Sequence, residues 1–149
     1  MEQIHSAVIE DYYGVLCLLS EILRIRGHNI ITITSSKCLC SGSTLHSSCS
    51  QQCHKCPCAD FLLLDLYLID FYTLSWWENA YNRGCPVPNV AKLSASWTET
   101  EKEKARQLNC AVFEKPFDVS EFNEWIAKGE KYLQTMKEDD SGEQNHPPA

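Results

Sequence analysis

Acidic side chains stand at the ends of two predicted strands, where a parallel sheet brings functional groups together. The run Asp60–Asp65 has four apolar residues between two acids, which is typical of a strand buried on both faces. Ile4–Ile9 also reads as a strand, and it ends in Glu10 and Asp11. If the two strands are neighbours, Glu10, Asp11 and Asp65 converge at one edge of the sheet. The alternative is that Asp65 is only a loop aspartate after a core strand.

Three adjacent carboxylates repel one another unless a cation neutralises them, and oxygen ligands at a phosphate-handling site favour Mg²⁺. Two more groups belong to the same predicted edge. Ser94 ends a predicted strand and offers a hydroxyl, and Lys115, just before Pro116, offers a positive charge. Acids, a metal ion, a hydroxyl and a lysine together can hold a phosphoryl group on a carboxylate nucleophile.

The elements that must position these groups alternate between strands and helices. Strands are predicted at 4–9, 28–34, 60–65, 89–94 and 110–114, and helices at about 15–23, 74–81, 98–108 and 118–133. Thr98 with Glu101, and Asp118 with Glu121, resemble capping boxes that open two of these helices. This pattern predicts an α/β fold, with a mostly parallel sheet and helices on both faces.

Composition limits the classes of function. The chain has 149 residues and a formal net charge of -7, which suits one domain and argues against non-specific nucleic-acid binding. No apolar run approaches the roughly 20 residues that span a bilayer. The N-terminus lacks the regions of a signal peptide, so we predict a cytoplasmic protein without a membrane partner. Residues 1–135 are predicted to form the domain, and residues 136–149 an acidic, then Pro-rich, disordered tail.

Four short motifs, in this order, resemble those of response-regulator receiver domains of two-component signalling. They are Val8-Ile9-Glu10-Asp11, Leu63-Leu64-Asp65, Leu93-Ser94-Ala95 and Glu114-Lys115-Pro116-Phe117. The resemblance runs from about Ile4 to Leu133, apart from a Cys-rich segment at 35–59 in place of the second helix. It implies a doubly wound, flavodoxin-like fold whose five parallel strands have the order 2-1-3-4-5.

The resemblance also implies the roles of the site residues. Asp65 would accept a phosphoryl group from a sensor histidine kinase or a phosphotransfer protein, Ser94 would contact that group, and Lys115 would pair with it. The ligands implied for Mg²⁺ are Glu10, Asp11, Asp65 and the backbone carbonyl of Tyr67. The chain would be a single-domain response regulator that signals through a downstream protein. It would not be an enzyme beyond its own phosphorylation and dephosphorylation.

Three positions depart from the receiver pattern. Ile69 stands where proline is usual, Thr73 where glycine is usual, and Val112 where an aromatic switch residue is often found. Because threonine adopts a positive φ less cheaply than glycine, we expect a reshaped loop after Asp65. The alternative function is a pseudo-receiver that has lost phosphorylation and serves as a metal- or redox-sensing interaction module.

Cysteines are concentrated in the segment that replaces the second helix. Six of the nine cysteines lie between residues 38 and 58, and in a reducing compartment such clusters are more often metal ligands than disulfides. Close pairs of thiolates suit a tetrahedral Zn²⁺ ion, although an iron–sulfur cluster or a metal-free thiol loop are alternatives. The predicted ligands are Cys38, Cys40, Cys53 and Cys56.

Overall fold

The computed structural model describes residues 3–33, 59–65, 67–68, 71–82, 84 and 87–144. The chain divides into two compact units, Met1–Pro116 and Phe117–Ala149. Within the described residues, no helix is long and apolar enough to cross a membrane. The predicted ligands of the cysteine segment all lie outside the described residues, so that metal site stays a prediction: Cys38, Cys40, Cys53 and Cys56.

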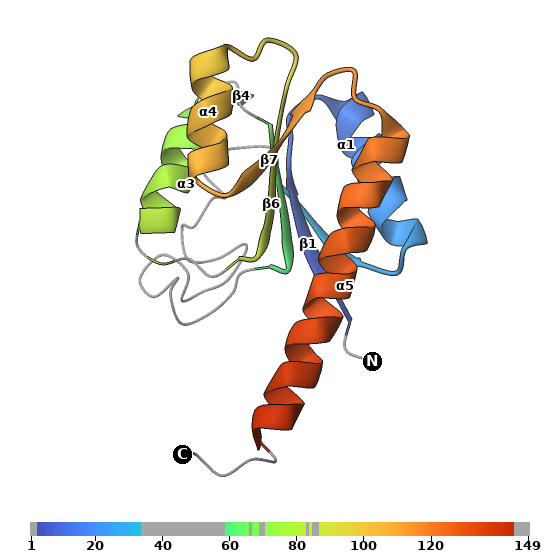
Figure 1. Cartoon of the computed structure of the whole chain (residues 1–149). Helices are drawn as coiled ribbons and strands as arrows, with labels where there is room; N and C mark the ends of the chain where they lie inside the picture. Colours follow the sequence, from blue (N-terminus) through green and yellow to red (C-terminus); the bar gives the residue numbers. More distant parts are fainter. Residues whose placement is uncertain are drawn as a thin grey trace. The chain divides into compact units, whose positions relative to one another are not determined.

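Five parallel strands form the central sheet of the first unit (Figure 1). They are β1 (His5–Ile9), β2 (Asn29–Ile33), β3 (Phe61–Asp65), β6 (Asn89–Ser94) and β7 (Cys110–Glu114). Their spatial order is β2-β1-β3-β6-β7, and every neighbouring pair is parallel. The strand order 2-1-3-4-5 and the doubly wound fold class are therefore confirmed.

Strand β3 lies at the centre of the sheet, and all of its residues are buried. It pairs with β1 on one side and with β6 on the other. A strand covered on both faces needs apolar side chains on both, which explains its unbroken apolar run. Asp65 is in register with Leu93 of β6, and Ser94 is in register with Glu114 of β7. The last residues of these strands therefore meet at one edge.

Helix α1 (Tyr13–Ile25) lies on one side of the sheet, and α3 (Thr73–Asn82) and α4 (Glu99–Gln107) lie on the other (Figure 1). The capping box predicted at Thr98 opens α4. The Thr98 hydroxyl accepts a hydrogen bond from the Glu101 amide at 3.1 Å, and the Glu101 carboxylate accepts one from the Thr98 amide at 3.0 Å. Both bonds satisfy amides that the first turn of a helix leaves unpaired.

The core on the α3 and α4 side is centred on Trp77. This residue is 1% exposed, and its indole Nε1 donates a hydrogen bond to the Leu108 carbonyl at 3.0 Å. A buried indole needs such an acceptor for its N–H group. The same cluster includes Leu64 from β3, Leu74 from α3 and Ala105 from α4. The two helices are thereby attached to the strand that carries Asp65.

A short hairpin follows β3 and was not predicted. It consists of β4 (Tyr67–Leu68) and β5 (Phe71–Tyr72), which pair antiparallel. Thr73 then begins α3 and is fully buried. Among the described residues, Asn109 is the non-glycine residue with a positive φ, so Thr73 avoids the backbone conformation that glycine would favour.

Helix α5 (Val119–Gln144) belongs to the second unit. Asp118 caps its start, because its Oδ1 accepts hydrogen bonds from the Ser120 amide at 2.8 Å and the Glu121 amide at 3.4 Å. The helix runs past Leu133, where the sequence predicts its end, so residues 136–144 are helical rather than disordered. The domain boundary at residue 135 stays a prediction.

Candidate functional site

Three carboxyl groups gather at the carboxyl edge of the sheet. Glu10 follows β1 and is 1% exposed, and Asp65 ends β3 and is 8% exposed. Asp11 is half-buried. One oxygen atom from each of these side chains lies within 4.8 Å of the other two. The structure thus brings together the three acids that the sequence places at this edge.

Lys115 reaches the same cluster from the segment after β7. Its Nζ atom lies 2.9 Å from Glu10 Oε2 and 3.3 Å from Asp65 Oδ1. Its backbone amide donates a hydrogen bond to the Ser94 carbonyl at 2.8 Å. Charges at these separations interact strongly where water is largely excluded. Lys115 therefore neutralises part of the negative charge of the carboxyl cluster.

The pKa of Asp65 is raised from its ordinary value of 3.8 to about 7. Burial is the main cause, the charge of Glu10 adds to it, and Lys115 opposes both. Without a further cation, this raised pKa favours the protonated form of Asp65 well above the pH at which a free carboxyl group ionises. A cation bound between the carboxylates would favour the ionised form, which is the nucleophilic one.

Ser94 ends β6 and is 3% exposed. Its Oγ accepts a hydrogen bond from the Ser96 amide at 3.1 Å, which orders the loop that leads to α4. Because this bond uses an oxygen lone pair, the hydroxyl hydrogen is available to donate. Ser94 and Asp65 lie on adjacent strands at the same edge of the sheet.

Two further residues that the sequence singled out lie on strands near the carboxyl cluster. Tyr67 lies in β4, just after Asp65, and the role of its carbonyl as a metal ligand stays a prediction. Val112 lies in β7, is partly buried and packs against the core.

Two residues that support Asp65 were not identified from the sequence. The Thr73 hydroxyl donates a hydrogen bond to the Asp65 backbone carbonyl. Lys92 of β6 is 0% exposed, and its Nζ donates a hydrogen bond to the Thr73 carbonyl at 2.9 Å. Burial lowers the pKa of Lys92 to about 7, although Cys110 and Asp65 act in the opposite direction. The sequence places this lysine within an otherwise apolar strand, but lysine is rarely fully buried, so the sequence did not indicate that Lys92 is buried.

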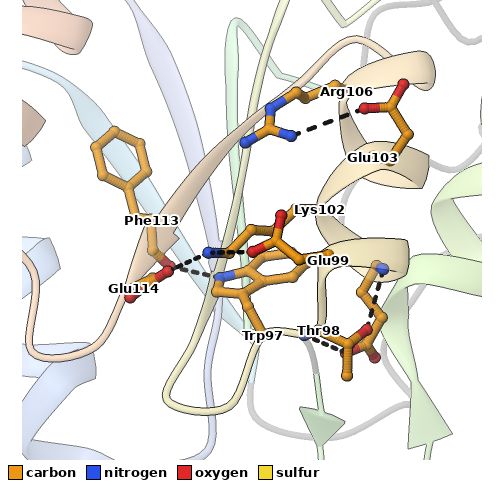
Figure 2. A network of polar contacts seen from close by, with 9 residues as sticks. Trp97, Thr98, Glu99, Lys102, Glu103, Arg106, Phe113 and Glu114 are labelled. Atoms are coloured by element: carbon orange, nitrogen blue, oxygen red, sulfur yellow. Dashed lines mark hydrogen bonds and ion pairs between the residues drawn. The ribbon is translucent and has the colours of Figure 1, made fainter.

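Figure 2 shows a polar network that joins α4 to β7. Lys102 of α4 forms an ion pair with Glu114, the last residue of β7. Trp97, in the loop before α4, donates its Nε1 hydrogen to the Phe113 carbonyl at 2.8 Å. These contacts hold α4 and its preceding loop against the end of β7, next to Lys115.

No protein-family model matches the sequence, and no curated protein is detectably similar to it. Solved receiver domains are similar in structure. The receiver domain of a putative Luxo repressor protein from Vibrio parahaemolyticus has a TM-score of 0.72 at 14% identity, covering 91% of this chain and 96% of that one. The BeF3-activated DrrB receiver domain has a TM-score of 0.68 at 15% identity, covering 87% and 99%. The non-phosphorylated HemR receiver domain from Leptospira biflexa has a TM-score of 0.65 at 20% identity, covering 85% and 94%. The chain therefore has the receiver-domain fold of response regulators.

Proposed function

We propose that this protein accepts a phosphoryl group on Asp65 from a sensor histidine kinase or a phosphotransfer protein. The proposal is carried by one observation, the position of the buried Asp65 carboxyl group among Glu10, Asp11 and Lys115. The receiver-domain fold supports it, although fold alone does not establish function. With this role the protein is a signalling domain in the cytoplasm, and its only chemistry is its own phosphorylation and dephosphorylation.

In the proposed transfer, a carboxylate oxygen of Asp65 attacks the phosphorus atom of a phosphohistidine. The bond from that oxygen to phosphorus forms as the bond from phosphorus to the imidazole nitrogen breaks. The imidazole keeps the electron pair of the broken bond and takes up a proton. Lys115 lies 3.3 Å from Asp65 Oδ1, so its charge can balance the phosphoryl oxygens, and Ser94 can donate a hydrogen bond to them.

The three acids fit a magnesium ion. Mg²⁺ prefers oxygen ligands and often uses few carboxylates together with water molecules, and Glu10, Asp11 and Asp65 each bring one oxygen within 4.8 Å of the others. We propose the Tyr67 carbonyl as a further ligand. The bound ion would supply positive charge to the phosphoryl group during transfer. The zinc or iron–sulfur site of the cysteine segment is a separate prediction.

Signalling would pass from the site to a downstream protein that binds α4 and β7 of the first unit. The bond from the Lys115 amide to the Ser94 carbonyl joins the ends of β7 and β6. Trp97 and Lys102 then connect the loop before α4, and α4 itself, to β7. Movement of Ser94 and Lys115 around a phosphoryl group would therefore reach α4, as in other ligand-driven switches of loops.

Mass spectrometry after treatment with acetyl phosphate and Mg²⁺ tests the proposal. The wild type should gain the mass of one phosphoryl group, and Asp65→Asn should not. Asp60→Asn is the matched control, because Asp60 precedes β3 at its opposite end and its Oδ2 accepts a hydrogen bond from the His5 amide at 2.8 Å. This control should gain the phosphoryl mass like the wild type. Phosphorylation of Asp65→Asn to the wild-type extent would refute the assignment.

A further inference from the structure

Lys92 is a fully buried lysine in a strand between two other strands of the sheet. It is 0% exposed and lies on β6, which pairs with β3 and β7. Burying an amine costs free energy unless it is hydrogen-bonded, and lysine is almost never fully buried without a partner. Methionine would fill a similar volume without this cost. The position therefore calls for a specific function of the Nζ atom.

The Nζ atom connects Lys92 to Asp65 through one intermediate residue. It donates a hydrogen bond to the Thr73 carbonyl at 2.9 Å, and the Thr73 hydroxyl donates one to the Asp65 carbonyl. Thr73 is 0% exposed and is the first residue of α3. The β4–β5 hairpin lies between Asp65, the last residue of β3, and Thr73, the first residue of α3. The bond from the Thr73 hydroxyl to the Asp65 carbonyl thus closes the base of this hairpin, and the bond from Lys92 attaches that base to β6.

We infer that Lys92 is a positioning residue for Asp65, acting through Thr73. Lys92 holds Thr73, and Thr73 fixes the backbone from which the Asp65 carboxylate projects. The inference rests on the proposed phosphorylation of Asp65. Charge on Lys92 is not required, because a neutral amine also donates a hydrogen bond to a carbonyl. Small errors in the position of a reacting group reduce rates strongly, so the support should be visible in the kinetics.

Phosphorylation rates of single and double variants test this inference. Lys92→Met removes the donor and keeps the side chain long and apolar, and Thr73→Val removes the hydroxyl and keeps the shape. With acetyl phosphate and saturating Mg²⁺, each should slow phosphorylation about tenfold, and the double variant should be no slower than the slower single variant. Thr73→Ser keeps the hydroxyl and should retain most of the rate.

Trp77→Phe is the control for a general loss of core stability. It removes another buried hydrogen bond, from Nε1 to the Leu108 carbonyl at 3.0 Å, which does not lead to Asp65. We expect Trp77→Phe to lower the melting temperature and to leave the phosphorylation rate unchanged. A wild-type rate in Lys92→Met would overturn the positioning role, whatever the melting temperature of that variant.

A second measurement separates this inference from the proposed function. If the wild type takes up no phosphate, the proposed function fails, and the ¹³C resonance of the Asp65 backbone carbonyl then decides the inference. This resonance reports the hydrogen bond from the Thr73 hydroxyl. It should shift in Lys92→Met and stay in place in Trp77→Phe. An unmoved resonance in Lys92→Met would overturn the connection from Lys92 to Asp65.

Discussion

Replacement of Asp65 by asparagine should stabilise the metal-free protein more at pH 8 than at pH 5. The pKa of Asp65 is about 7 in the folded chain, mainly because of burial, against an ordinary value of 3.8. Between these values the folded state binds more protons than the unfolded state. The stability of the wild type therefore falls as the pH rises from about 4 to about 7. The variant lacks the titrating group and should not show this fall.

The size of the effect follows from the two pKa values. Relative to the fully protonated group, titration of Asp65 lowers the free energy of unfolding by roughly 2 kcal/mol at pH 5 and by roughly 4 kcal/mol at pH 8. The advantage of Asp65→Asn over the wild type should therefore grow by roughly 2 to 3 kcal/mol between these pH values. Asp65 is 8% exposed, but Lys115 beside it is 18% exposed and Asp11 is half-buried, so screening by solvent should bring the measured change toward the lower end of this range.

Urea unfolding of the wild type and of Asp65→Asn, in the presence of a chelator at pH 5 and at pH 8, measures how their difference in free energy of unfolding changes with pH. Asp60→Asn, outside the carboxyl cluster, is the matched control for the loss of one carboxylate. Saturating Mg²⁺ at pH 8 should reduce the advantage of Asp65→Asn, because a ligand of the folded state stabilises the protein that binds it better. An advantage that is equal at both pH values would refute the raised pKa of Asp65 and the charge balance inferred from it.

Three further predictions address the switch and the cysteine segment. Lys115→Ala should fold and bind Mg²⁺ but lose the spectral change on phosphorylation, and an unaltered change would contradict its switching role. Lys102→Met removes the ion pairs with Glu114 and with Glu99, which lies 3.5 Å from Lys102 Nζ, whereas Glu114→Gln removes only the first. Glu114→Gln should therefore change amide hydrogen exchange in α4 no more than Lys102→Met does, and the double variant should match Lys102→Met; additive effects would show that Lys102 and Glu114 act separately. Elemental analysis of anaerobically purified protein should find Zn²⁺, whereas reduced protein that is metal-free and takes up no Zn²⁺ would exclude the metal site. Its predicted ligands are Cys38, Cys40, Cys53 and Cys56.

Much of the fold could be predicted because its signals are local. The apolar run before Asp65 indicated a central strand, and strand β3 is buried throughout. Thr98 and Glu101 are close in sequence and form the capping box at the start of α4. Gly27 follows α1 with a φ of 84°, a conformation that glycine adopts without steric cost. Each of these features depends on residues that are neighbours along the chain.

The parts that could not be predicted depend on contacts between distant residues or on very short elements. Lys92 and Thr73 are 19 positions apart, and only the folded packing brings the amine to the carbonyl. A lysine in a strand ordinarily indicates a solvated face, so its burial was not apparent. Strands β4 and β5 have two residues each, which is too short for an alternating pattern.

The charges around Asp65 suit the switching role proposed for this site. Glu10, Asp11 and Asp65 carry three negative charges when ionised, and Lys115 carries one positive charge, so a single divalent cation balances the remainder. Phosphorylation adds negative charge and strong acceptor oxygens. We expect Lys115 to match them by turning from Glu10 and Asp65 toward the phosphoryl group. The Lys115 amide donates a hydrogen bond to the Ser94 carbonyl at 2.8 Å, so that movement would also act on the loop before α4. The added charge at Asp65 would then alter the surface that α4 presents to a partner.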